Sequence, residues 1–166
     1  MTRKLTRCAL FAAMMALCAW IGLPLGHTVF TMQTFGVLLA LGVLGGKRGT
    51  ISILCYLLLG GAGLPVFSGF RGGIGAILGP TGGYLWGFLA TGLVFWLLEK
   101  WSRPAAMIAG LVICYTCGTV WYMTYTGGAL AAVLAQTVLP YLIPDAVKLV
   151  LALRLTKRLK KISTAL

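Results

Sequence analysis

The chain has 166 residues, of which 60% are hydrophobic and only 10% are charged. A typical soluble domain has about 25% charged residues, so this composition excludes a water-soluble fold and predicts a single-domain integral membrane protein. The net charge of +12 would suit a nucleic-acid binder, but the basic residues lie in short groups between long apolar runs instead of on one polar face. We therefore expect no nucleic-acid partner, because positive charge beside membrane spans explains the pattern.

Breaks in the apolar pattern predict an all-α protein with six transmembrane helices, since a span needs about 20 mostly apolar residues. The basic and apolar N-terminus fits either a cleaved signal peptide or a retained first helix. We favour the helix, because cleavage would leave the pattern one span short. The expected spans are 5–23, 30–46, 50–63, 83–101, 105–125 and 144–157. A glycine-rich outer loop is expected at 64–82.

The segment 129–153 is ambiguous because it is apolar but contains two prolines and two charged residues. One interpretation is a single span that runs straight through it. We favour a short outer helix at 129–139, a turn at the sequence PYLIP, and a last span that begins at Pro144. A proline at the first helical position loses no hydrogen bond.

The distribution of basic residues supports an even number of spans. With a cytoplasmic N-terminus, every lysine and arginine except Arg71 and Lys148 lies on the inner side. This agrees with the positive-inside rule, whereas five spans would place the basic C-terminal tail outside. We therefore expect both termini in the cytoplasm and a multi-pass protein of the cell membrane.

Asp145 and Lys148 are the polar residues that most need an explanation. They are three residues apart and share one helix face. A charge inside the bilayer costs at least about 2.5–3.5 kcal/mol, so such residues face a partner or a cavity. The alternative is a simple ion pair that stabilises the helix start. We favour a binding site, because Arg71, Gln33 and Thr34 are expected on the same outer side.

Such a site offers a carboxylate, an ammonium and a guanidinium, which suits a small ligand with a polar head and an anionic tail. Aromatic residues near the outer face would supply apolar walls: Tyr84, Trp86, Trp121 and Tyr122. We include Gly73 among the candidate binding residues, because glycine lets the loop backbone pass close to a ligand.

The first span carries alanines spaced by four residues, namely Ala9 with Ala13 and Ala12 with Ala16. Small residues at this spacing permit close contact between membrane helices. The alternative is alanine as a general helix former. If the pattern is functional, this face contacts another membrane protein.

Catalytic and cofactor chemistry have little support. His27 is the only histidine, and the two acids, Glu99 and Asp145, are far apart in the sequence. One CxxC pair, Cys114 and Cys117, is a weak metal signal without further ligands. The stretches GGKRGT and GIGAILG lack the spacing of phosphate-binding and dinucleotide-binding loops. We expect no enzyme activity, no metal, no cofactor and no ATP site in this chain.

Four stretches resemble the BioY family, the biotin-binding substrate subunits (S components) of energy-coupling factor (ECF) transporters. They are GLPVFSGFRGG (63–73), LGPTGGYLWGF (78–88), TMQTFGVLLA (31–40) and PDAVK (144–148), and the resemblance covers about residues 5–160. It implies a six-helix S-component fold with a biotin site near the outer face. It also implies a partnership with a transmembrane coupling subunit and two ATPases, for which the alanine face of the first span looks like the docking surface.

The resemblance further implies that Asp145 and Lys148 contact the ligand. Biotin suits these residues, because its ureido group offers N–H donors to the carboxylate and a carbonyl oxygen to the ammonium. From charge and side alone, we expect Arg71 to meet the biotin carboxylate. The function expected is high-affinity biotin capture without chemical change. The alternatives are an S component for another vitamin, a membrane-embedded enzyme, or a purely structural subunit.

Overall fold

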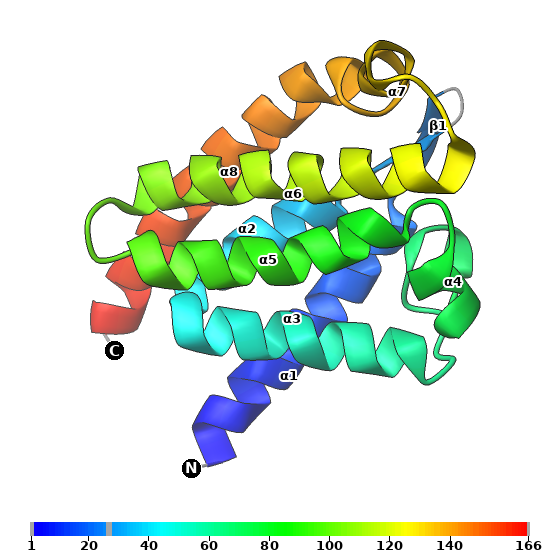
Figure 1. Cartoon of the computed structure of the whole chain (residues 1–166). Helices are drawn as coiled ribbons and strands as arrows, with labels where there is room; N and C mark the ends of the chain where they lie inside the picture. The colour runs from blue at the N-terminus through cyan, green and yellow to red at the C-terminus, as the bar shows by residue number, and fades with distance from the viewer. Residues whose placement is uncertain (1, 26–27, 166) are drawn as a thin grey trace.

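The structure is a computed structural model that describes residues 2–25 and 28–165, and it is a helical bundle with one small β-hairpin (Figure 1). The central helix α2 packs against α1, α3, α5 and α8. The elements in chain order are α1 (Thr2–Trp20), β1 (Gly22–Leu25), β2 (Thr28–Thr31), α2 (Gln33–Leu44), α3 (Gly46–Gly61), the 3₁₀ turn η1 (Ser68–Phe70), α4 (Ile74–Leu78), α5 (Gly82–Leu98), α6 (Arg103–Thr126), α7 (Leu130–Thr137) and α8 (Leu139–Ala165).

Both ends of α6 carry sequence signals that explain its bounds. The hydroxyl of Ser102 accepts a hydrogen bond from the backbone N–H of Ala105 at 3.4 Å, and Pro104 occupies the first turn, where no N–H is needed. Gly127 ends the helix with a left-handed φ of 68°, and its N–H bonds to the Met123 carbonyl at 2.8 Å. The apolar stretch between Arg103 and Gly127 therefore forms one uninterrupted helix.

Glycines bring α5 and α6 into close contact along their whole length. A Cβ at Gly118 would lie 2.2 Å from the Tyr84 ring, and one at Gly83 would lie 2.2 Å from the Trp121 Cβ. Midway along the pair, the Thr91 hydroxyl donates to the Gly110 carbonyl at 2.7 Å. Small residues with a hydroxyl between them are typical of helix pairs that pack inside a membrane.

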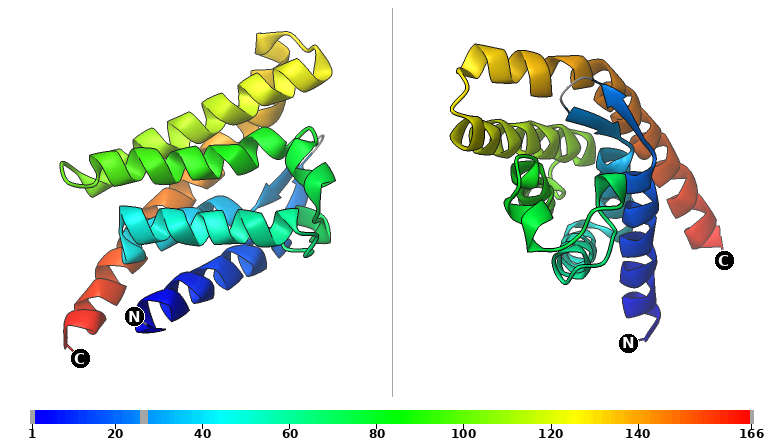
Figure 2. Two further views of the ribbon diagram at one scale, coloured as in Figure 1. Left: turned by 60° about the horizontal axis from the view of Figure 1, so that its bottom comes forward. Right: turned by 90° about the vertical axis from the view of Figure 1, so that its right-hand side faces the viewer.

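The all-α expectation is wrong for the segment between the first two helices. β1 and β2 form an antiparallel two-stranded sheet in which Gly22 pairs with Thr31 and Leu23 with Phe30. The sequence around Pro24 cannot continue α1, and threonine, valine and phenylalanine in the second strand favour extended backbone. The hairpin lies at the end of the bundle opposite both chain termini (Figures 1 and 2).

The predicted turn at PYLIP, and a last helix starting at Pro144, are also wrong. The break lies at Val138, where α7 and α8 meet at a bend of 43°, and Pro144 is inside α8. The proline that occupies the first turn is instead Pro140, the second residue of α8. A proline there loses no helical hydrogen bond, so the helix begins five residues earlier than expected.

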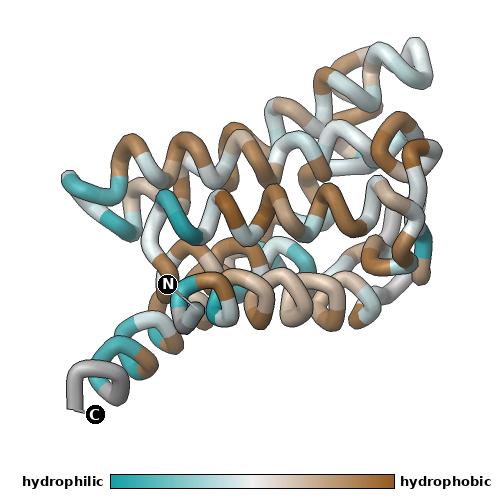
Figure 3. Tube along the Cα trace, turned by 90° about the horizontal axis from the view of Figure 1, so that it is seen from below, coloured by the Kyte–Doolittle hydropathy of each residue, from teal (hydrophilic) through white to brown (hydrophobic). Residues whose placement is uncertain are grey.

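Hydrophilic segments gather at the end of the molecule where the termini and the α5–α6 turn lie, whereas the middle parts of the helices are mostly hydrophobic (Figure 3). Among the described helices, α6 alone is long and apolar enough to cross a membrane by itself, and α7 with α8 qualifies as a bent pair. The apolar helices α2 and α5 are shorter. The mostly buried position of α2 allows a short helix, because neighbouring helices cover the backbone at its ends.

Candidate binding cavity

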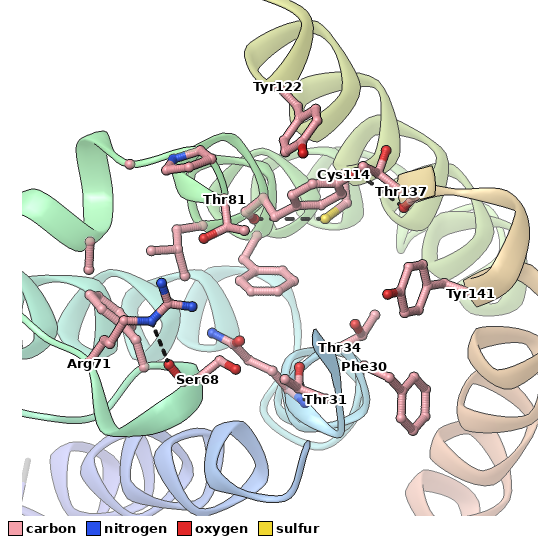
Figure 4. Close-up of a pocket in the computed structure, with 18 of the residues that line it drawn as sticks. Phe30, Thr31, Thr34, Ser68, Arg71, Thr81, Cys114, Tyr122, Thr137 and Tyr141 are labelled. Carbon is pink, nitrogen blue, oxygen red and sulfur yellow. Dashed lines mark hydrogen bonds between the residues drawn. The ribbon is translucent and has the colours of Figure 1, made fainter. Parts of the chain in front are cut away.

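A cavity of about 540 Å³ lies at the hairpin end of the bundle (Figure 4). Its size falls in the usual range for small-molecule sites. Its wall comes from β2, the start of α2, the loop 64–82, α5, α6, α7 and α8, and consists of Phe30, Thr31, Gln33, Thr34, Phe67, Ser68, Arg71, Gly72, Gly75, Ala76, Gly79, Pro80, Thr81, Tyr84, Leu85, Phe88, Leu111, Cys114, Tyr115, Tyr122, Thr137, Tyr141, Asp145 and Lys148.

Asp145 and Lys148 form a buried ion pair on α8 at this wall. The Lys148 Nζ lies 2.6 Å from the Asp145 Oδ1, and the two residues are 3% and 4% exposed, respectively. The other carboxylate oxygen, Oδ2, accepts a hydrogen bond from the Tyr115 hydroxyl on α6. Taking two charges out of water is costly, and these hydrogen bonds offset part of that cost. Each carboxylate oxygen has one protein partner and keeps capacity for another.

Lys148 also holds the β-hairpin. Its Nζ donates to the Thr31 carbonyl at 2.6 Å and lies 3.8 Å from the centre of the Phe30 ring. The Phe30 ring in turn stacks on Tyr141 of α8, with ring centres 6.3 Å apart. One ammonium therefore joins α8 to β2 through a hydrogen bond and a cation–π contact.

A second polar group comes from the start of α2. The Gln33 amide nitrogen donates to the Tyr56 hydroxyl at 2.7 Å, and that hydroxyl donates to the Val66 carbonyl at 3.0 Å. Gln33, 5% exposed, is thus fixed by α3 and by the loop that covers the cavity. Thr34 follows it on the same wall. Both predicted residues therefore line the cavity together with Asp145.

Arg71 and Ser68 approach the cavity from the side opposite Tyr141 (Figure 4). The Arg71 Nε donates to the Ser68 carbonyl at 3.2 Å, which leaves the guanidinium exposed at the cavity edge. The Ser68 hydroxyl is buried and has no hydrogen-bond partner among the described residues. A cation and an unpaired hydroxyl side by side suit a negatively charged ligand group.

The expected aromatic wall is half right. Tyr84 and Tyr122 line the cavity, and the Tyr84 hydroxyl donates to the Thr137 carbonyl at 3.2 Å. Trp86 and Trp121 are missing from the wall as far as the described residues define it, and they line a groove on the outside of α5 and α6. The helix period explains this, because residues two apart on α5 cannot point to the same side.

The prediction that Gly73 is a binding residue needs a correction, because Gly73 is absent from the cavity wall that the described residues form. It precedes α4 with a φ of 86°, and its N–H bonds to the Gly60 carbonyl at 2.7 Å. A side chain would strain this backbone, so its role is to shape the loop. Gly72, its neighbour, lines the cavity instead.

The loop over the cavity is also fixed to the end of α1. The Trp20 indole N–H donates to the Pro65 carbonyl at 2.8 Å, and its ring stacks on Phe70 with centres 5.0 Å apart. Phe70 has a φ of 57°, which is unusual for a residue other than glycine. Such strained backbone persists only where surrounding contacts hold it, and the Trp20 ring supplies one of them.

Comparison with known proteins decides the family. The BioY family profile matches residues 1–165. The chain belongs to the BioY family. It is 39% identical over 165 residues to a protein of Thermotoga maritima named biotin transporter BioY, covering 96% of this chain and 97% of that protein. A probable biotin transporter BioY of Pyrococcus horikoshii is also 39% identical, over 158 residues, covering 95% and 96% of the two chains.

A solved structure supports the same assignment. The crystal structure of the S component for biotin from an ECF-type ABC transporter aligns with a TM-score of 0.88 at 29% identity, covering 96% of this chain and 92% of that one. The BioY chain therefore has the S-component fold, which agrees with the fold that the sequence predicted.

The alanine face of α1 needs a correction in this BioY protein. Ala12 and Ala16 are 3% and 7% exposed and pack in the hydrophobic core of the chain. A partner cannot touch residues that the bundle already covers. Ala9 and Ala13 are exposed, so they alone remain candidates for a docking surface.

Residues that sequence reasoning missed include Tyr115, Ser68 and Phe30. Tyr115 lies in the middle of an apolar stretch, where no pattern separates it from a lipid-facing tyrosine. Within the described residues, no group of histidine, cysteine and acidic side chains could hold a metal ion. His27 lies outside the described residues.

Proposed function

We propose that this chain is the biotin-binding S component of an ECF transporter, and that it captures biotin at the outer face without altering it chemically. The observation that carries the proposal is the buried Asp145–Lys148 pair at the wall of a ligand-sized cavity. The family membership and the names of the relatives support biotin as the ligand.

The ureido group of biotin would bind at Asp145. One ureido N–H would donate to a free lone pair of the carboxylate, and the third N–H of the Lys148 ammonium would donate to the adjacent ureido oxygen. The apolar body would lie along the aromatic wall formed by Phe67, Tyr84 and Phe88. The carboxylate tail would reach Arg71 on the other side of the cavity. The polar groups at each end of the cavity thus match the polar group at the corresponding end of biotin.

We also propose six membrane spans in a prokaryotic cell membrane, with both termini in the cytoplasm. The termini lie at the same end of the bundle (Figure 2), as an even number of spans requires. That end carries the hydrophilic segments, which suits the positive-inside rule. The cavity at the opposite end then opens to the outside, where biotin arrives.

The proposed partners are a transmembrane coupling subunit and two ATPase subunits of an ECF module, with membrane lipids around the bundle. Ala9 and Ala13, exposed in the middle of α1, offer a smooth helix face to the coupling subunit. ATP hydrolysis in the partners would supply the energy for uptake.

Two measurements test this function. Purified protein in detergent is titrated with biotin by calorimetry, and saturable binding at one site is expected. Mass spectrometry of the small molecules that copurify identifies the bound ligand, and a different vitamin there would replace biotin in the proposal. Uptake of labelled biotin by cells with and without an ECF module then shows whether the chain needs the ATPases.

A further inference from the structure

The cavity contains a hydroxyl group that joins two helices at the charged end of the site. Tyr115 lies on α6, and its hydroxyl donates to the Asp145 Oδ2 on α8. Both residues line the cavity. The helices α6 and α8 otherwise contact each other little. This hydrogen bond therefore connects two helices that line different sides of the cavity.

The hydrogen bond also defines the orientation of the Asp145 carboxylate. Lys148 holds Oδ1 at 2.6 Å, which by itself leaves the carboxylate free to rotate about its last side-chain bond. The Tyr115 hydroxyl, reaching Oδ2 from a different helix, fixes the carboxylate plane. The lone pairs that remain on the two oxygens then point in set directions, as a hydrogen bond from a ureido N–H requires.

We infer that Tyr115 is a positioning and specificity-determining residue of the ligand site, which acts through Asp145 to hold the carboxylate in the orientation that a ureido group recognises. The inference rests on the proposed function, because it takes biotin as the ligand. Its chemistry applies to ligands that present an N–H donor beside a carbonyl oxygen, and it explains how one aspartate selects such a group against analogues that lack the N–H.

The test compares Tyr115→Phe with the wild-type protein, both purified and titrated with biotin. Loss of a hydrogen bond to a charged group predicts about ten- to a hundredfold weaker binding. The matched control is Tyr125→Phe, which removes a hydroxyl from the same helix at an exposed position, 57% accessible, that is not part of the cavity. The control should bind biotin as wild type does.

Comparing the affinities for two ligands distinguishes a positioning role of Tyr115 from a general loss of stability in the variant. A biotin analogue with methylated ureido nitrogens cannot donate to Asp145, so the wild type should bind it much more weakly than biotin. Tyr115→Phe should reduce this discrimination by about tenfold, because the carboxylate no longer holds its accepting lone pair in a fixed direction. A merely destabilised protein would lose affinity for both ligands equally, and that result would overturn the inference.

A double-mutant cycle shows whether Tyr115 acts through Asp145 or independently of it. In an Asp145→Asn background, adding Tyr115→Phe should change the affinity by about threefold or less, because the charged partner is already gone. A further tenfold loss in the double variant would mean that Tyr115 acts independently of Asp145. If wild-type protein fails to bind biotin, the proposed function fails; if wild type binds and Tyr115→Phe binds equally well, only the role of Tyr115 fails.

Discussion

Replacement of Asp145 by asparagine tests the centre of the site. The change keeps the size and shape of the side chain but removes its negative charge. Lys148, 3% exposed, would keep the Thr31 carbonyl and the Phe30 ring as partners but lose its counter-ion. The amide nitrogen of the new side chain cannot accept an N–H from the ligand, so the expected hydrogen bond from the ureido N–H is replaced there by a clash between donors.

The expected loss follows from these contacts. A hydrogen bond to a charged group contributes about 1.5–3 kcal/mol, and each 1.4 kcal/mol is tenfold, so Asp145→Asn should raise the Kd for biotin by about ten- to a hundredfold or more. Leaving a buried cation uncompensated also costs about 3–5 kcal/mol, so the thermal unfolding midpoint without ligand should fall. Calorimetric titration and a thermal melt of the detergent-purified protein measure the two effects.

Glu99→Gln is the matched control, because Glu99 is the only other acidic residue of the sequence. Its carboxylate accepts a hydrogen bond from the Gly46 backbone N–H at 3.0 Å, outside the cavity wall. The same chemical change there should leave the Kd for biotin within about twofold. If Asp145→Asn and Lys148→Ala both bind biotin like wild type, the site lies elsewhere.

Four further changes probe other parts of the structure. Arg71→Ala should weaken biotin about tenfold and leave biotin methyl ester nearly unchanged, since a lost charge contact affects the acid alone; an unchanged affinity ratio would remove Arg71 from the site. Gly60→Ala places a Cβ 2.1 Å from the Phe67 ring and should push that ring into the cavity, so titration should show weaker biotin binding. Trp20→Phe should speed hydrogen exchange in 64–73, because the ring stack stays but the indole hydrogen bond is lost. Ala13→Leu should block uptake in cells while purified protein still binds biotin; normal uptake would refute docking through this face.

Much of the fold follows from the hydrophobic pattern and from the capping residues, prolines and glycines that end helices. Ser102, Pro104 and Gly127 bound α6 close to the expected span 105–125, because caps and prolines act locally. The hairpin and the bend at Val138 were not predicted, since both depend on contacts with other helices. Pro140 and Pro144 both allow a helix start in the sequence, and the tertiary packing of α7 and α8 selects between them.

The charged residues of the candidate site are predictable from the sequence, because the rest of the chain around them is apolar. Asp145, Lys148 and Arg71 stand out because an apolar chain rarely carries such residues without a use, and the structure brings them to one cavity. Tyr115 and Ser68 have no comparable signal, as tyrosine and serine are common in membrane helices and loops. The alanine pattern could not show which side the core covers, because Ala12 and Ala13 are adjacent in the sequence, yet Ala12 is buried and Ala13 is exposed.

The contact between Trp20 and the cavity loop would link partner docking on α1 to the position of the loop over the cavity. Trp20 ends the helix that carries the exposed Ala9 and Ala13, and the same residue bonds Pro65 and stacks on Phe70. If a partner displaces α1, the loop must follow it or lose both contacts. Coupling between two binding events is reciprocal. If docking of the partner favours the open loop by a certain free energy, a loop that the ligand holds closed disfavours docking by the same free energy. A loaded and an empty subunit would then differ in affinity for the same partner, although the ligand never touches that partner.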